Sequence, residues 1–272
     1  MLSTAALVAL FNATGGPNWL NKSGWLRSPV CDPPWHGVRC VGGQPASLNL
    51  TEYNRLSGTL PSEIGLSGVD TSLFLSKSPF RYFSRDFVNN ISMQDGSMVL
   101  QGSFSGTIPS QLGLTNLSQN LAMSETAISG TIPNELGTEL LQLRGMLVLR
   151  VSSLSGTLPQ SIGDDRRLTT YVDMYWNRIS GTVPPKLSHL HALSRLALSN
   201  NTISGTIPTQ LGRLTSLQSF LDLFGNRISG TVPTQIGKIP AKESLFLSNN
   251  RLSGNVYPTP SSYPLLCLLP SP

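Results

Sequence analysis

Side chains that could carry out catalysis or hold a metal ion are scarce in this chain of 272 residues. It has three histidines, and two of them, His189 and His191, stand close together with no cysteine or carboxylate nearby in the repeat. A zinc site draws three or four ligands from such groups. The sequence also contains no Gly-x-Ser-x-Gly elbow, phosphate-binding loop, dinucleotide fingerprint or zinc-protease motif. We therefore expect a protein that is not an enzyme, uses no cofactor and binds no metal.

Charged side chains are sparse and scattered along the sequence. They make up 12% of the residues, and the net charge is +5. Nucleic-acid sites and polybasic membrane sites need dense runs of lysine and arginine, which this sequence does not contain. Asp164 and Asp165, followed by Arg166 and Arg167, are interpreted as a solvated ion-pair patch. We therefore expect no nucleic-acid partner.

The spacing of the three cysteines bears on whether the protein works in an oxidising compartment. Cys31 and Cys40 lie nine residues apart in a segment rich in proline and tryptophan. A close pair suggests a disulfide and therefore an oxidising environment. Cys267 stands alone near the end of the chain, which leaves three explanations open: missing partner sequence, a free thiol, or an intermolecular bond.

Asn-x-Ser/Thr sequons are compatible with a secreted glycoprotein. We expect possible N-glycosylation at Asn12, Asn21, Asn90 and Asn116. Two further sequons, at Asn49 and Asn200, are poor candidates because a glycan there would crowd the face of a strand.

All of these residues are positioned by a repeat. The string Ser-Gly-Thr-(Ile/Leu/Val)-Pro recurs at intervals of 24 to 26 residues after a first gap of 48. We interpret that gap as two repeats, the first of which has lost its second half, and count nine units. Self-similarity at this period is the sequence signature of a solenoid. The string begins at Ser57, Ser105, Ser129, Ser155, Ser180, Ser204 and Ser229, with a weaker copy at Ser253.

Each unit predicts a short strand followed by a turn. In Leu196-Ala197-Leu198 the leucines alternate with a residue that must face the other way, as in a strand with one buried face. An asparagine three residues later recurs in phase as Asn177, Asn201, Asn226 and Asn250. Buried there, it would bond the backbone of neighbouring coils and form a ladder. Ser78, Gly102, Thr126 and Ser152 replace it in the first half, so we expect those coils to be looser.

This pattern, Leu-x-Leu-x-x-Asn-x-(Leu/Ile)-Ser-Gly-Thr-(Ile/Val)-Pro, resembles the plant-type leucine-rich repeat of receptor-like kinases, receptor-like proteins and polygalacturonase-inhibiting proteins. It covers Ser47 to about Val256. The resemblance implies an α/β fold, a leucine-rich-repeat solenoid. Its features would be a curved right-handed superhelix, a parallel β-sheet on the concave face and short helical or 3-10 turns on the convex face. A second small sheet would form from the Gly-x-(Ile/Leu)-Pro segments.

The ends of the chain divide it into three parts. Residues 1–45 resemble the N-terminal cap of such solenoids, with a short amphipathic helix, three tryptophans and the Cys31–Cys40 bridge covering the first coil. Residues 46–257 hold about nine repeats, of which the second is degenerate. Residues 258–272 form a Pro/Ser-rich tail without a recognisable cap. No stretch is long and apolar enough to span a bilayer.

A ligand of a solenoid binds the outward residues of its strands. In the early coils we expect small or weakly polar ones, namely Ser72, Phe74, Met98, Gln101, Ala122 and Ser124. The later coils combine aromatic residues with arginine, as binding hot spots do. The predicted ligand-binding residues are Arg150, Tyr171, Asp173, Tyr175, Trp176, Arg195, Asp222, Phe224 and Phe246. A sparse basic ridge, made of Arg55, Arg178, Arg227 and Arg251, is expected only to solubilise the surface.

Several functions fit this surface. The first is an extracellular or cell-surface recognition module, receptor-like, that binds a protein, peptide or glycan on the concave face. The alternatives are a secreted inhibitor of a cell-wall hydrolase and a structural or ice-binding repeat protein, against which the irregular outward residues count. The resemblance also leaves open that the chain is a fragment of a larger membrane-anchored receptor.

Overall fold

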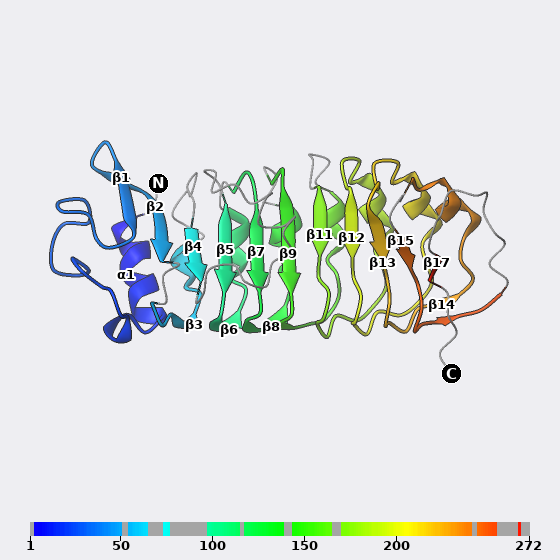
Figure 1. Ribbon diagram of the computed structural model, residues 1–272, viewed down its shortest axis with the longest axis horizontal. Helices are drawn as coiled ribbons and strands as arrows, with labels where there is room; N and C mark the ends of the chain where they lie inside the picture. The colour runs from blue at the N-terminus through cyan, green and yellow to red at the C-terminus, as the bar shows by residue number, and fades with distance from the viewer. Residues whose placement is uncertain are drawn as a thin grey trace.

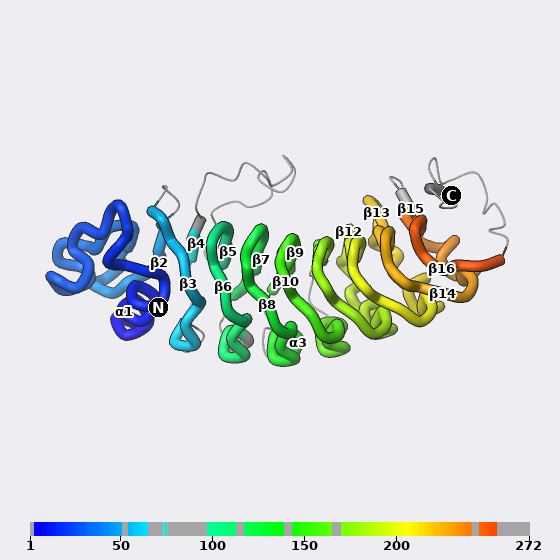
Figure 2. The backbone as a smooth tube through the Cα atoms, turned by 90° about the horizontal axis from the view of Figure 1, so that it is seen from below, coloured from blue at the N-terminus to red at the C-terminus, as the bar shows by residue number. Residues whose placement is uncertain are grey.

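The computed structural model describes residues 3–50, 54–64, 73–76, 97–114, 117–138, 143–164, 170–240, 244–254 and 266–267. The coils stack side by side in one elongated, gently curved array (Figures 1 and 2). Helical segments are short. They are α1 (Thr4–Ala13), η1 (Gly16–Asn18), η2 (Ser62–Ile64), η3 (Ser110–Leu114), α3 (Glu135–Thr138), η4 (Gln160–Gly163), η5 (Pro185–His189), η6 (Thr209–Arg213) and η7 (Thr234–Lys238).

One strand of each coil enters an 11-stranded sheet on the concave face. Neighbouring strands are parallel after the initial β1–β2 hairpin, and Val172, for instance, pairs with Leu147 on one side and Leu196 on the other. In order, the strands are β1 (Val38–Val41), β2 (Gln44–Leu50), β4 (Leu73–Ser76), β5 (Met98–Gln101), β7 (Leu121–Ser124), β9 (Met146–Arg150), β11 (Tyr171–Asp173), β12 (Arg195–Ala197), β13 (Phe220–Asp222), β15 (Ser244–Phe246) and β17 (Leu266–Cys267).

The core runs through the inside of the coils as one continuous apolar cluster. In β12 and the residue after it, Leu196 and Leu198 are fully buried and join this cluster, whereas Ala197 points to the concave face. Because each coil buries its leucines only against its neighbours, stacking supplies the stability. Within the described residues, no helix is long and apolar enough to cross a membrane.

The recurring asparagine connects neighbouring coils. Asn201 Nδ2 donates to Met174 O at 2.9 Å and to Leu198 O at 3.2 Å, and its Oδ1 accepts the amide of Ile179 at 2.9 Å. Asn177, Asn226 and Asn250 make the equivalent bonds. Each side chain thereby satisfies backbone groups that the turn leaves without a partner.

A second sheet lies on one flank of the array and faces the viewer in Figure 2. Its strands are β3 (Ser57–Thr59), β6 (Ser103–Thr107), β8 (Ala127–Thr131) and β10 (Ser153–Ser155), in the order β10-β8-β6-β3. Isolated bridges and the pair β14 (Ser229–Gly230) and β16 (Arg251–Leu252) continue it. Strand β3 pairs directly with β6, so no flank strand of the β4 coil stands between them among the described residues, which agrees with the first gap of 48 residues.

In the coils without the asparagine, the described concave strands are longer than those of the later coils. Strands β5 to β9 have four or five residues, whereas β11 to β15 have three. Thr126 and Ser152 replace the missing amides, with their hydroxyls 2.9 Å apart, and Thr126 Oγ1 also accepts the amide of Ile128. Short hydroxyl side chains therefore provide a simpler version of the ladder. Ser78 lies outside the described residues.

The N-terminal cap covers the first coil with aromatic rings. Helix α1 buries Leu7, Leu10 and Phe11, and Phe11 stacks on Trp25 with ring centroids 5.4 Å apart. Asn54 of the first coil accepts the amide of Asn21 and donates back to its carbonyl, which joins cap and coil.

The other end of the array carries one further strand. Leu266–Cys267 forms β17, which pairs with β15 and extends the concave sheet by one strand. The remainder of residues 258–272 lies outside the described part of the chain.

Candidate functional site

The strand register brings the predicted ligand-binding residues together on the concave face. Tyr171, Arg195 and Phe220 are direct neighbours across β11, β12 and β13. Asp173, Ala197, Asp222 and Phe246 form the next row. We call these residues, with Tyr175, Trp176 and Phe224, the concave cluster.

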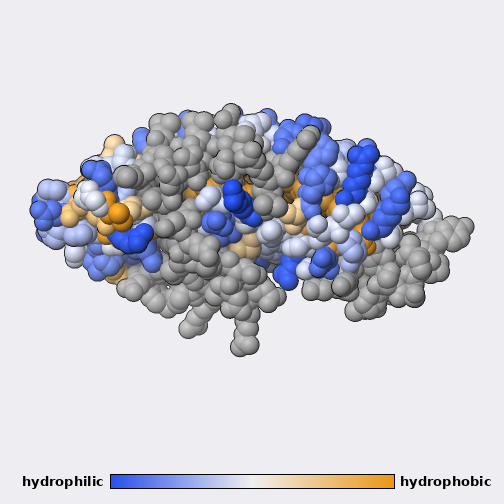
Figure 3. Space-filling model, turned by 90° about the horizontal axis from the view of Figure 1, so that it is seen from above, coloured by the Kyte–Doolittle hydropathy of each residue, from blue (hydrophilic) through white to orange (hydrophobic). Residues whose placement is uncertain are grey.

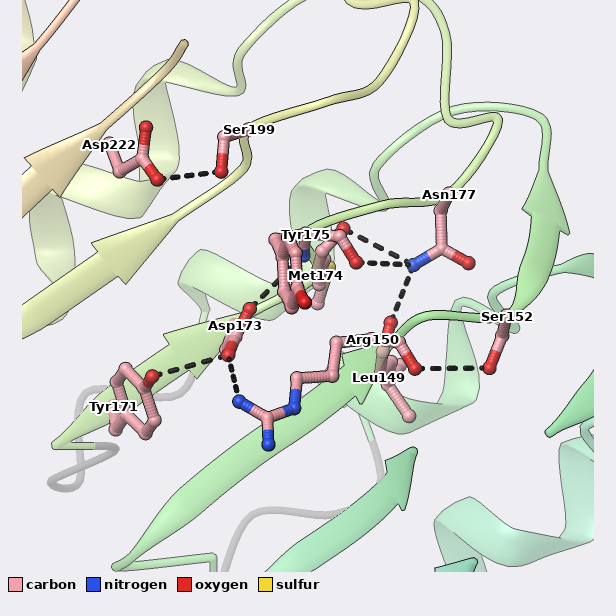
Figure 4. A network of polar contacts seen from close by, with 10 residues as sticks. All are labelled: Leu149, Arg150, Ser152, Tyr171, Asp173, Met174, Tyr175, Asn177, Ser199 and Asp222. Atoms are coloured by element: carbon pink, nitrogen blue, oxygen red, sulfur yellow. Dashed lines mark hydrogen bonds and ion pairs between the residues drawn. The ribbon is translucent and has the colours of Figure 1, made fainter. Parts of the chain in front are cut away.

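A buried ion pair lies beneath the cluster (Figure 4). Arg150 Nη1 is 3.4 Å from Asp173 Oδ2, and the two side chains are only 11% and 3% exposed. Tyr171 Oη donates to the same oxygen at 3.2 Å, and the Tyr175 amide donates to Oδ1 at 3.1 Å. Asp173 thus holds β9 to β11 and fixes both tyrosines. Its role is structural support of the surface, not open contact with a ligand.

Burial dominates the electrostatics of this pair. It raises the pKa of Asp173 above its ordinary value, although the Tyr175 amide and the Arg150 charge act in the opposite direction. Burial also raises the pKa of the Tyr171 hydroxyl, and the Asp173 charge adds to that shift. Tyr171 therefore remains a neutral hydrogen-bond donor.

Arg195 lies between two aromatic rings. Its guanidinium carbon is 5.7 Å from the centroid of Tyr171 and 5.5 Å from that of Phe220. Phe220 in turn meets Phe246 edge to face at 6.4 Å. All four side chains are partly exposed. The arrangement presents one cation among flat apolar rings, where a cation–π contact contributes to its position.

Trp176 is the most exposed large apolar side chain of the described residues, at 61%. Its backbone is left-handed, with φ of 57°. The same position is left-handed in six successive coils, and Asn200, Gly225 and Asn249 occupy it in the three that follow. Asparagine and glycine tolerate this conformation, whereas a bulky residue is strained in it. Glu125 and Val151 hold the same backbone in the two preceding coils, so exposure rather than strain distinguishes Trp176.

Asp222 repeats part of the role of Asp173 two coils further on. Its Oδ1 accepts the amide of Phe224 at 3.0 Å, and Oδ2 accepts the Ser199 hydroxyl at 2.6 Å. Burial raises the pKa of Asp222, and these hydrogen bonds oppose the shift. The aspartate therefore fixes the turn that carries Phe224.

The structure corrects some of the outward assignments. Met98 belongs to the inner core, because Val99 is the β5 residue that faces the concave side. Val99, Ala122, Met146 and Val148 form a separate buried cluster there, and Tyr171 packs against it. Gln101 and Ser124 are buried too, while Ser72 and the side chain of Phe74 lie outside the described part. Phe220 was missed, although it occupies the same phase as Tyr171 and Arg195.

The other sequence candidates lie away from this cluster. His189 is the last residue of η5 and His191 lies two residues beyond it. No group of three potential metal ligands occurs in the part of the chain that the structure describes. Asp164 pairs with Lys186 of the next coil at 2.8 Å on the surface, and Asp165, Arg166 and Arg167 are outside the described ranges.

The structure locates some of the candidate glycosylation sites and the paired cysteines. Asn12 and Asn21 are exposed, whereas Asn90 and Asn116 are not described. Cys31 and Cys40 form a disulfide in the cap with Cα atoms 5.9 Å apart. Arg55, Arg178, Arg227 and Arg251 are all exposed along one edge of the flank sheet.

Comparison with known proteins agrees with this architecture. The profile of the Leucine Rich Repeat family matches residues 192–214. The leucine-rich-repeat ectodomain of the plant membrane receptor kinase GASSHO1/SCHENGEN3 from Arabidopsis thaliana, solved in complex with CASPARIAN STRIP INTEGRITY FACTOR 2, superposes with a TM-score of 0.62 at 26% identity. The match covers 94% of this chain and 33% of that one. The chain has the fold of a plant leucine-rich-repeat ectodomain, and one of its repeats matches the Leucine Rich Repeat profile.

Two further solved structures share the fold of this leucine-rich-repeat chain. A plant ice-binding protein gives a TM-score of 0.57 at 22% identity, with 92% of this chain and 94% of that one covered. The ectodomain of the Arabidopsis receptor kinase HAESA, in complex with an extended IDA peptide hormone, gives 0.54 at 24%, with 91% and 45% covered. No curated protein sequence matches the chain significantly. The chain spans about a third of the length of the GASSHO1/SCHENGEN3 ectodomain.

Proposed function

We propose that this leucine-rich-repeat protein is an extracellular, receptor-like recognition module that binds a peptide or protein ligand through the concave cluster. The observation that carries the proposal is Arg195 held between Tyr171 and Phe220 on a partly exposed face. Tryptophan, tyrosine and arginine supply most of the energy at protein interfaces. Because a buried ion pair fixes the strands below, little side-chain entropy is lost when a ligand binds.

Two observations support an extracellular ligand. The Cys31–Cys40 disulfide fits an oxidising compartment. The GASSHO1/SCHENGEN3 ectodomain, which this chain resembles, was solved with a bound factor. In the same setting, the exposed Asn12 is a candidate for N-glycosylation.

A peptide selection tests the proposal. The purified chain is immobilised and challenged with a phage-displayed random peptide library, and the affinities of the enriched synthetic peptides are then measured by calorimetry. We expect Trp176→Ala, Tyr175→Ala and Arg195→Ala to weaken binding about tenfold or more, as hot-spot residues do.

Arg227→Ala is the matched control, since Arg227 is an exposed arginine on the flank sheet rather than the concave face. It should bind the peptides as the wild type does. If the three concave variants also bind with unchanged affinity, the concave cluster is not the ligand site.

A further inference from the structure

The helical turns on the convex side carry charges whose sign changes along the array. Within the described residues, η2, η3, α3 and η4 with its C-cap hold no lysine or arginine, and η5, η6 and η7 hold no carboxylate. In Figure 3, strongly hydrophilic side chains stand along the convex edge of the C-terminal half. We call the charged residues of these turns the convex ridge, which has an acidic half followed by a basic half. They are Glu63, Glu135, Asp164, Lys186, Arg213 and Lys238.

The two halves of the ridge meet at an ion pair. Lys186 Nζ of η5 lies 2.8 Å from Asp164 Oδ1 at the end of η4. Helix α3 packs against η4 one coil earlier, and η6 packs against η5 one coil later. Glu135 and Arg213 therefore stand the same number of coils from the midpoint of this pair, on opposite sides of it.

The basic half encloses a small hollow that suits a carboxylate. The hollow lies between η6 and η7, has a volume of about 270 Å³, and is lined by Arg213 and Lys238 and by no acidic residue. Gln210 lines it as well. The oxygen of this amide accepts the Thr209 hydroxyl at 3.3 Å, which leaves its N–H groups as donors. Two cations and an amide donor thus surround one space.

The acidic half has a matching groove. This groove runs past η3 and α3, is lined by Glu135, Gln111 and Asn134, and has no lysine or arginine in its walls. Glu135 and Arg213 are both exposed, and neither forms an ion pair with another residue in the described ranges. Their charges are therefore available to a partner.

We propose that the convex ridge binds a second copy of this chain in antiparallel orientation. A two-fold axis through the Asp164–Lys186 pair places Glu135 of one copy opposite Arg213 of the other, and the same contact forms again by symmetry. An unrelated acidic partner would use only the basic half of the ridge. A second copy uses both halves, because each half is the electrostatic complement of the other.

The shape of the array limits the size of this contact. Because the side that carries the turns bows outward (Figure 2), two ridges touch only near their midpoints. Small, polar contacts of this kind give weak association that depends on salt. The two concave clusters would point away from each other and stay open, so the dimer is independent of ligand binding.

Sedimentation velocity of the full chain over a concentration series tests the proposal. Wild type should form dimers at low ionic strength and dissociate in about 1 M salt, where charges are screened beyond about 3 Å. Arg213→Glu and Glu135→Arg each set like charges against each other at both symmetric contacts. Each variant alone should therefore dimerise about tenfold more weakly or less. An equimolar mixture of the two should dimerise as the wild type does, since both contacts again join a carboxylate and a guanidinium.

Arg227→Glu is the matched control, because it makes the same change of charge on the flank sheet, where Arg227 is exposed. It should dimerise as the wild type does. A wild type that stays monomeric at low ionic strength would overturn the proposal, even if it bound polyglutamate through Arg213. A mixture of Arg213→Glu and Glu135→Arg that remains monomeric would overturn it too, as would an equal loss of dimer in Arg227→Glu.

Discussion

Arg150 and Asp173 lie one coil apart and face each other below the concave surface, with Nη1 3.4 Å from Oδ2. Both tyrosines of the concave cluster are bonded to this aspartate. The pair therefore links the strand ladder to the surface that we propose binds a ligand, although neither side chain is itself open to solvent.

Removal of one partner should be costly. Arg150→Ala leaves a buried carboxylate without its counter-charge, and we expect the free energy of unfolding to fall by about 3 kcal/mol. Urea unfolding measures it. Lys186→Ala, which breaks the exposed pair with Asp164, should cost about 1 kcal/mol or less. The double variant Arg150→Met/Asp173→Asn, which removes both charges and keeps an amide oxygen as acceptor for the Tyr175 amide, should recover part of the loss. Equal costs for the two single variants would show that the buried pair has no special role.

We expect that replacing Trp176 stabilises the fold but weakens ligand binding. Trp176→Asn places a residue that tolerates the left-handed backbone at φ of 57°, and we expect the free energy of unfolding to rise by about 1 kcal/mol. The same variant should lose affinity for selected peptides. Val151→Asn, at the same position one coil earlier with φ of 49°, should gain stability and keep its affinity. A destabilised Trp176→Asn would contradict the assignment of strain.

The buried carboxylates predict how stability depends on pH. Since burial raises the pKa of Asp222 above its ordinary value, the folded state holds this proton more tightly than the unfolded chain does. The stabilisation is complete below the unfolded pKa and is lost as pH rises through the folded one. Asp222→Asn should therefore flatten the fall in unfolding free energy above about pH 4. Denaturant titrations over a pH series would show it, and an unchanged slope would refute it.

The asparagine ladder should contribute more per coil than its hydroxyl substitute. Asn201→Ala leaves the Ile179 amide without its side-chain partner and removes one of the two asparagine bonds to Met174 O and to Leu198 O, so we expect a loss of about 2 kcal/mol. Thr126→Val removes the hydroxyl bonds to Ser152 and Ile128 and should cost about 1 kcal/mol. Thermal melts compare the two variants, and a larger loss for Thr126→Val would reverse the ranking.

Much of the fold follows from periodicity in the sequence. The spacing of Ser-Gly-Thr strings sets the coils, and the Leu-x-Leu phase identifies the inner face, because a shift by one residue would turn every leucine outward. That logic placed Tyr171, Arg195 and Phe246 correctly in the strand phase. It failed at Met98, where Met98, Val99 and Leu100 are all apolar, so alternation gives no phase.

Side-chain burial within the site could not be predicted from the pattern. Arg150 and Asp173 occupy outward phases, yet each is covered because the other lies across the coil boundary. Whether two side chains of neighbouring coils meet depends on how the two strands are aligned, and the sequence of a single repeat does not specify that alignment.

Hydrogen–deuterium exchange with a selected peptide tests the central claim most directly. The chain is compared with and without saturating peptide, and protection is mapped by segment. Binding at the concave cluster predicts slowed exchange in residues 171–176, 195–199 and 220–224, with little change in η5, η6 and η7 on the convex side. Protection confined to the convex segments or to the N-terminal cap would contradict the account.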